Sequence, residues 1–121
     1  MFKLFSMEEA NKLIPAVDTL VSDMQVSISD ITRLRAELGT YTKHSVEAQN
    51  KVQELHFLMR SVQETKAQLD RMGVFVQDVD AGLVDIPSQV GGEVVLLSWE
   101  KGEDSIQHYH RLSEGTRLPL A

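Results

Sequence analysis

The spacing of apolar residues changes at Gly73, and this change divides the chain into two parts. Before Gly73, apolar residues recur every three or four positions over about seventy residues, which is typical of amphipathic helices. After Gly73 they alternate with polar residues or run together, as in short strands. The pattern predicts an α+β fold of one domain, residues 1–121. A coiled-coil-like antiparallel hairpin of two long helices (1–73) precedes a small antiparallel sheet of three to four strands (74–121).

The first helix has a recognisable start and end. The segment Ser6–Glu9 has the sequence of a capping box, in which the Ser6 and Glu9 side chains each accept the other's backbone N–H. Gly39 ends the helical pattern, and Pro15 is expected to kink the first turns. The apolar stripe between the two ends consists of Leu13, Val17, Leu20, Met24, Ile28, Ile31, Leu34 and Leu38.

The second helix is expected to begin between Thr42 and Ser45. It should end at Gly73, because glycine adopts the left-handed conformation that often follows a helix. Since the linker between the helices has only about five residues, the helices must run antiparallel. The stripe of the second helix consists of Ala48, Val52, Leu55, Met59, Val62, Lys66 and Leu69.

Two helices alone cannot bury both stripes, because the seam between a pair of helices is narrow. Ile14, Val21, Phe57 and Leu58 lie beside that seam, and the second part of the chain is too short to cover its whole length. The surplus apolar surface predicts a homodimer in which two hairpins form a four-helix bundle. The alternative is a monomer whose sheet curls over the helices.

Four segments after Gly73 have strand-like patterns, and turn residues separate them. Pro87 is expected to end the second strand, Gly91 and Gly92 to break the chain again, and Lys101–Asp104 to form a hairpin loop. The tail, Thr116–Ala121, is predicted to be irregular. The expected strands are Val74–Val79, Leu83–Ile86, Glu93–Trp99 and Ser105–Leu112.

Composition narrows the class of protein. The chain has no cysteine, which excludes disulfides, thiolate-bound zinc and cysteine nucleophiles. The longest uninterrupted apolar run is Val94–Leu97, far too short to span a membrane, and the N-terminus lacks the long apolar stretch of a signal peptide. No membrane association is therefore predicted, and a cytoplasmic location is the default expectation.

The net charge of −6 is concentrated in the second part of the chain. Residues 1–73 contain nine Lys/Arg and ten Asp/Glu, whereas residues 74–121 contain three and eight. Neither part has the basic surface that binding to a nucleic-acid backbone needs, so no nucleic-acid partner is predicted. The acidic second part favours cations or basic partners, or is simply a solvated acidic surface.

His108 and His110 are two positions apart on an expected strand, so their side chains share one face. Two imidazoles and a carboxylate suit zinc or iron(II), and Asp85 and Glu103 are the candidate carboxylates for such a divalent-metal site. The alternative is that both histidines are structural or face solvent. No cofactor other than such a metal is indicated, and no enzyme motif such as Gly-x-Ser-x-Gly or a P-loop is present.

The register of the last hairpin decides where the two histidines point. A four-residue loop pairs Leu97 with His108 and places both histidines on the apolar face beside Trp99. A three-residue loop places Tyr109 there and sends the histidines to the opposite face. Asp85 likewise has two interpretations: it binds backbone amides of the adjacent turn, or it orients His110 for acid–base chemistry.

Three blocks of sequence resemble a family of small prokaryotic proteins known as domain of unknown function 2203, over nearly the whole chain. The first is Phe5–Pro15, with its Glu-Glu-Ala-Asn followed by Pro. The second joins Gly73–Asp78 to Gly82–Pro87, where Ile86 replaces the usual Phe. The third runs from Trp99 to His110. The chain departs from the family pattern after His110, where Arg111 replaces an Asp and the following segment is shorter.

The resemblance supports the order of elements and implies a bacterial protein, but it brings no activity with it. If the family has a common site, the matched positions are Asp85, Trp99, Glu103, His110 and Arg117. The leading hypothesis is therefore an uncharacterised, non-enzymatic, self-associating interaction or scaffold protein. The alternative is a protein that binds a metal or small molecule, including a hydrolase, through His108, His110 and nearby carboxylates.

Overall fold

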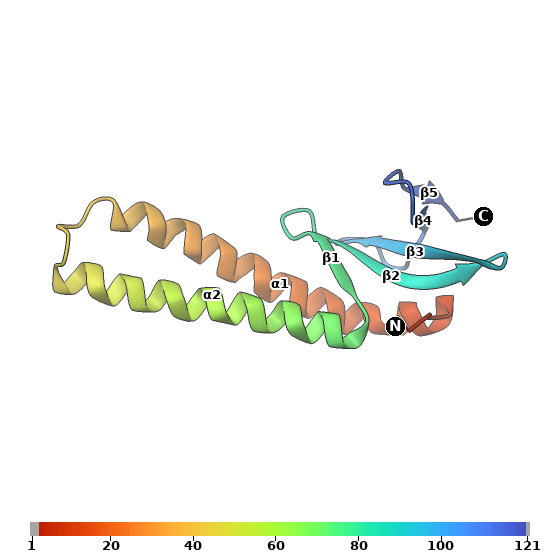
Figure 1. Cartoon of the computed structure of the whole chain (residues 1–121), viewed down its shortest axis with the longest axis horizontal. Coiled ribbons are helices and arrows are strands. Elements are labelled where there is room, and N and C mark those ends of the chain that lie inside the picture. Colours follow the sequence, from red (N-terminus) through yellow and green to blue (C-terminus); the bar gives the residue numbers. More distant parts are fainter. Residues whose placement is uncertain (1–2, 121) are drawn as a thin grey trace.

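The protein is a long helical hairpin with an antiparallel sheet packed against one half of it (Figure 1). The computed structural model describes residues 3–120. The helices are α1 (Met7–Leu38) and α2 (Val46–Met72), and the strands pair in the order β1-β2-β3-β4-β5. The α+β fold is confirmed, but the sheet has five strands rather than three to four. The strands are β1 (Phe75–Asp78), β2 (Leu83–Val90), β3 (Glu93–Glu100), β4 (His108–Arg111) and β5 (Leu118–Pro119).

The helix ends are those that the sequence predicts. Ser6 caps α1: its Oγ accepts the Glu9 N–H at 3.0 Å, and Glu9 Oε1 accepts the Ser6 N–H at 2.9 Å. Ser45 caps α2 by accepting the Ala48 N–H at 3.1 Å. Gly73 ends α2 in the left-handed conformation, with φ of 86°. Together these caps fix the length of the hairpin.

The core lies between the sheet and the N-terminal half of α1 (Figure 1). The residues of α1 that face this core are Ala10, Ile14, Val17, Val21 and Met24, and the sheet contributes Val84, Ile86, Leu97 and Trp99. By contrast, α2 fully buries a single residue, Leu69. The half of the hairpin next to the α1–α2 loop extends beyond the sheet, so the sheet does not cover it (Figure 1). No helix within residues 3–120 is long and apolar enough to cross a membrane.

Polar side chains on α1 hold the loops of the sheet in place. Asn11 Oδ1 accepts the N–H of Ile106 at 2.9 Å, and Gln25 Nε2 donates to the carbonyl of Val79 at 2.9 Å. Lys101 pairs with Asp18 on the same helix. These contacts tie two loops of the sheet, the β1–β2 turn and the β3–β4 loop, to one helix.

The prediction that Pro87 ends the second strand is wrong, because β2 continues through it to Val90. Proline has no N–H to donate, so it is tolerated where no neighbouring strand needs that bond. Asp85 is the last residue of β2 in this direction that pairs with β1, and it lies opposite Phe75. Beyond it, the segment before α1 takes over: Phe5 donates its N–H to the Pro87 carbonyl at 2.8 Å.

The last hairpin has the register that places Tyr109 opposite Leu97 and His110 opposite Leu96. Tyr109 therefore packs against the core, and both histidines lie on the opposite face of the sheet. β4 begins only at His108, so the predicted strand from Ser105 is too long. The tail is not irregular throughout, because Leu118 pairs with Tyr109 to form β5. Ala121 lies outside the described residues.

Candidate functional site

The predicted site residues gather on the outer face of the sheet, by which we mean the face turned away from the helices. Val84 and Ile86 pack in the core, so Asp85 between them points to the outer face. Ser98 of β3 lies opposite Asp85, and His108 of β4 lies opposite Ser98. The strand register therefore brings polar groups from three neighbouring strands together.

Asp85 and His110 form a buried pair on this face. His110 Nε2 lies 3.0 Å from Asp85 Oδ2, with side-chain exposures of 15% and 1%. The contact is close in distance but outside hydrogen-bond geometry, and neither carboxylate oxygen accepts a well-formed hydrogen bond. The other ring nitrogen, Nδ1, lies 3.2 Å from the carbonyl oxygen of Arg111 and 3.0 Å from that of Glu114.

This geometry fixes the protonation of the pair. A carbonyl oxygen only accepts hydrogen bonds, so Nδ1 of His110 must carry a proton. A second proton is then needed between Nε2 and Oδ2, because otherwise the lone pair of a neutral ring faces a carboxylate. The pair therefore holds one proton in addition to that on Nδ1, either as imidazolium and carboxylate or as imidazole and carboxylic acid.

The pKa values of both residues are raised, in agreement with this shared proton. Burial raises the pKa of Asp85, and this outweighs the lowering by His110, by Gln77 and by the charge of Arg117. Burial alone lowers the pKa of His110, but the Asp85 carboxylate and the carbonyls of Arg111 and Glu114 outweigh it and raise the pKa. Proton binding at this pair is therefore favoured in the folded protein.

A second polar cluster surrounds Glu103 at the edge of the same face. Arg117 donates to Glu103 Oε1 at 2.9 Å, and also to the Oγ and carbonyl of Ser98 at 2.7 and 3.2 Å. His108 Nδ1 lies 3.3 Å from Glu103 Oε2. The indole N–H of Trp99 donates to the Glu103 carbonyl at 2.8 Å. The cluster joins β3, the loop before β4 and the segment before β5.

The family-matched residues thus fall into two contacting groups, Asp85 with His110 and Glu103 with Arg117. Trp99 is different, because its ring is 1% exposed on the helix side of the sheet and contacts Glu103 only through the backbone. Asp85 does not bind the amides of the adjacent turn, so the contact with His110 is the interpretation that the geometry favours. Sequence reasoning missed Ser98, whose role in holding Arg117 depends on the strand register.

The four residues considered for a metal site do not converge. His110 contacts Asp85, whereas His108 contacts Glu103. Among residues 3–120, no group of three or more His, Asp or Glu side chains is arranged to hold a metal ion. The two histidines share a face as predicted, but each pairs with its own carboxylate.

An open cavity of about 330 Å³ lies next to the buried pair on the outer face; we call it the sheet cavity. Asp85 and Gln77 are its polar lining residues. The apolar lining consists of Phe75, Pro87, Val94, Leu96 and Leu112. Val94 and Leu96 are apolar on the face that does not pack against the helices, which is a sequence signal for this cavity.

Comparison with known proteins identifies the family but no relative of known activity. No curated protein and no solved structure has significant similarity to the chain. The profile of one family matches residues 3–118, and its description is "Uncharacterized conserved protein (DUF2203)". The match includes both helices, the paired residues Asp85 and His110, and the cluster around Glu103. The chain therefore belongs to the DUF2203 family of uncharacterised conserved proteins.

Proposed function

We propose that the protein is a non-enzymatic, self-associating interaction protein, and that the far half of the hairpin is its contact surface. The observation that carries this proposal is the burial along α2: of its 27 residues, only Leu69, near the sheet, is fully buried. A helix of this length normally buries a continuous apolar stripe. α1 therefore covers the stripe of α2 only in part: Leu55 and Val62 are half-buried, whereas Val52 and Met59 remain exposed.

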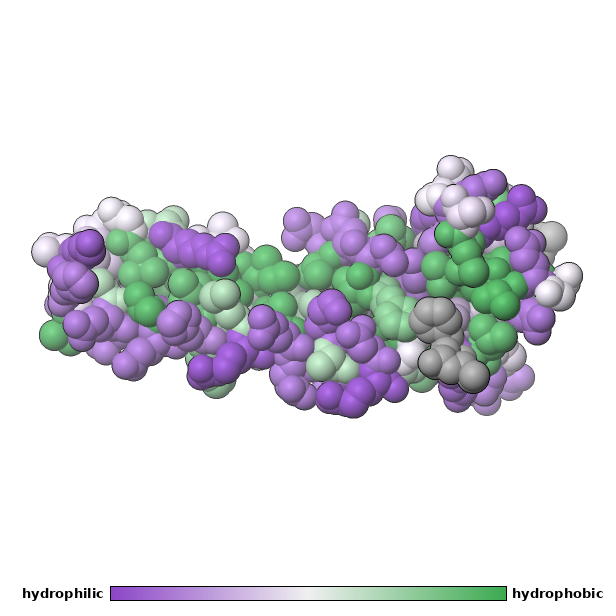
Figure 2. Space-filling view, in the orientation of Figure 1, coloured by the Kyte–Doolittle hydropathy of each residue, from purple (hydrophilic) through white to green (hydrophobic). Residues whose placement is uncertain are grey.

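The uncovered apolar residues continue the seam of the hairpin. Val52 and Met59 are two turns apart on one stripe of α2, with 37% and 36% of their surfaces exposed. Apolar residues continue along the uncovered half of the hairpin in the space-filling view (Figure 2). Val46 and Phe57 are more exposed, at 69% and 62%, but at 3.6 residues per turn they lie on a different side of α2 from Val52 and Met59.

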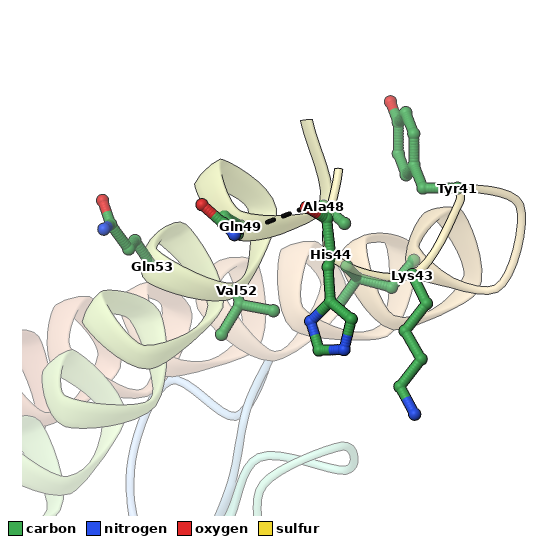
Figure 3. Close-up of a pocket in the computed structure, with 8 residues that line it drawn as sticks. Tyr41, Lys43, His44, Ala48, Gln49, Val52 and Gln53 are labelled. Carbon is green, nitrogen blue, oxygen red and sulfur yellow. Dashed lines mark hydrogen bonds between the residues drawn. The ribbon is translucent and has the colours of Figure 1, made fainter. Parts of the chain in front are cut away.

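A groove at the end of the hairpin, which we call the tip groove, extends this stripe (Figure 3). It has a volume of about 570 Å³. Its apolar lining residues are Leu38, Tyr41, Ala48 and Val52, and its polar ones are Lys43, His44, Gln49 and Gln53. Single exposed apolar residues are common on any protein, but a stripe that continues into a groove is typical of a contact surface.

The distribution of charge favours a second copy of this chain as the occupant. Residues 26–60 of the hairpin contain five Lys/Arg and four Asp/Glu, so two copies meeting there repel each other little. Two of these basic residues are already paired, because Arg33 and Lys51 both contact Glu37 within one chain. An antiparallel arrangement of two hairpins also keeps the two acidic sheets at opposite ends of the dimer.

Sedimentation equilibrium at low micromolar concentration tests the proposal. We expect twice the mass of one chain for the wild type and one chain mass for the double variant Val52→Glu/Met59→Glu, because buried carboxylates would oppose the contact. The matched control is Asn50→Glu/Gln68→Glu, which adds the same charge at exposed positions on the opposite side of α2 and should remain dimeric. A wild type that sediments as one chain would refute the proposal, as would a dimer that survives both glutamates at Val52 and Met59.

A further inference from the structure

The sheet cavity has walls on two sides. The order of the strands places β2 and β3 between β1 and β4. Pro87 of β2 and Leu96 of β3 lie opposite each other and form the floor of the cavity. Phe75 of β1 lies on one side of this floor, and Leu112, directly after β4, lies on the other. The sheet cavity is therefore a recess between two walls rather than a flat apolar patch.

The size of the sheet cavity fits a small molecule. Its volume of about 330 Å³ lies at the lower end of the range of ligand pockets. Because a water molecule occupies about 30 Å³ in the liquid, this space corresponds to a ligand of roughly ten non-hydrogen atoms. Two turns of an α-helix, about 10 Å wide and about 11 Å long, fill more than twice this volume. The cavity is therefore too small to hold a helix of a partner protein.

The lining of the cavity offers no net charge to a ligand. Among residues 3–120, Asp85 is the one ionisable side chain that lines the cavity. Its carboxylate shares a proton with His110, so the two side chains together are neutral. Gln77, the other polar lining residue, already interacts with this carboxylate and lowers the pKa of Asp85. A cation or an anion in the cavity would therefore lose its hydration without meeting a free opposite charge.

We propose that the sheet cavity binds an uncharged, mainly apolar small molecule of the size of a single substituted ring. The ligand packs against the floor and both walls, which removes apolar surface from water on both sides of the contact. Val94 and Leu96 are only half-buried in the free chain, because the helices pack on the other face of the sheet. The lining residues all belong to the sheet or to the turn after β4, so this site is separate from the contact surface on the hairpin.

Titration of the ¹⁵N-labelled full chain with benzyl alcohol, followed by amide chemical shifts at about pH 6, tests the proposal. At this pH, below the ordinary histidine pKa of 6.5, the pair of Asp85 and His110 holds its shared proton. Benzylamine and benzoate are the cationic and anionic probes of matched shape. We expect saturable shifts of Val94 and Leu96 with benzyl alcohol, and binding about tenfold weaker or less with both charged probes. No saturable shift with benzyl alcohol, or equal binding of either charged probe, would overturn the proposal.

Two sets of variants locate the site. Val94→Trp fills the cavity with an indole ring and should abolish saturable binding of benzyl alcohol. Val90→Trp makes the same change at a 40% exposed position of the same hairpin that does not line the cavity, and it should keep the affinity within about twofold. Leu112 is 63% exposed, so Leu112→Asn tests one wall without disturbing the core, even if Val94→Trp fails to fold. We expect Leu112→Asn to weaken binding about threefold or more and Leu112→Met to preserve it. Full affinity in Leu112→Asn, or in a folded Val94→Trp variant, would contradict the proposed site.

The tip groove is a second apolar recess, so the same titration is repeated on the double variant Val52→Glu/Met59→Glu, which changes the groove lining at Val52. We expect the shifts of Val94 and Leu96 to saturate as in the wild type, because the far half of the hairpin does not line the sheet cavity. Loss of benzyl alcohol binding in this variant would assign the probe to the tip groove and refute the proposed site in the sheet.

Discussion

His110 on β4 covers Asp85 on β2 from across the intervening strand, with Nε2 3.0 Å from Oδ2. Because its Nδ1 faces two backbone carbonyls, the imidazole needs a second proton to approach the carboxylate favourably. The contact between His110 on β4 and Asp85 on β2 therefore depends on the protonation state of the pair.

The pKa of His110 and that of Asp85 are both raised on folding, which sets the sign of the pH dependence. The stability that His110 contributes is complete below its ordinary pKa of 6.5 and is lost as the pH rises through its higher folded-state pKa. The stability that protonation of Asp85 contributes is likewise lost as the pH rises above the ordinary aspartate pKa of 3.8 and through the higher pKa of the folded state. We therefore expect the free energy of unfolding to fall as the pH rises above about 6.5.

Urea unfolding at a series of pH values measures this slope. His110→Gln should flatten it, because the variant lacks the imidazole; the groups that face this imidazole are the Asp85 carboxylate and the carbonyls of Arg111 and Glu114. The control His56→Gln removes an exposed imidazole on α2 and should keep the wild-type slope. An unchanged slope in His110→Gln would show that the pair does not hold the extra proton.

Arg117 is expected to couple energetically to Glu103, because it joins the segment before β5 to the loop before β4. Both side chains are largely buried, at 27% and 20% exposure, and Arg117 also donates to Ser98. A double-mutant cycle with Arg117→Ala and Glu103→Gln, measured by chemical denaturation, should give a coupling energy of about 1–2 kcal/mol.

The matched comparison for this cycle is the exposed pair of Arg111 and Glu93, whose nearest charged atoms are 3.6 Å apart. Its side chains are 47% and 56% exposed, so solvent screens the interaction and its coupling should stay below about 0.5 kcal/mol. Equal coupling energies in the two cycles would contradict the structural role of Arg117.

Gly73 is expected to be intolerant of any side chain for two separate reasons. Its φ is 86°, in the left-handed region, and an added Cβ would lie 2.8 Å from a ring carbon of Phe5. Gly73→Ala should therefore destabilise the protein by about 2 kcal/mol or more in thermal or chemical unfolding. Gly91→Ala is the control, since Gly91 has φ of 58° but no atom within 4 Å, and it should cost about 1 kcal/mol. Similar costs at both positions would mean that Phe5 does not pack tightly against Gly73.

His44 is expected to be a site of stabilising substitution. It is the one residue other than glycine with positive φ among residues 3–120, with φ of 67°, in the loop before α2. His44→Gly should raise the free energy of unfolding by about 0.5–1 kcal/mol, because glycine adopts this conformation without strain. The hydrogen bond that the His44 carbonyl accepts from Gln49 involves only the backbone of residue 44 and should persist. Lys43→Gly, in the same loop, should instead leave stability unchanged or lower it.

The sequence alone determined the elements whose signals are local. A helix start depends on side chains within one turn, so Ser6 could be identified as a cap, and the start of α2 could be placed between Thr42 and Ser45. The end of α2 follows from Gly73, and the antiparallel hairpin from the short linker. The shared face of His108 and His110 follows from the period of a strand, and the family follows from blocks that run along most of the chain.

Only the tertiary structure decided features that depend on contacts between distant segments. β2 continues through Pro87 because the segment before α1, rather than a neighbouring strand, bonds the Pro87 carbonyl. The register of β4 follows from the burial of Tyr109, and β5 exists only because Leu118 finds a strand edge there. These choices bring Asp85 to His110 and Arg117 to Ser98 and Glu103. No local pattern encodes such pairings, because a shift of one residue in the register of β4 would turn His110 to the other face, away from Asp85.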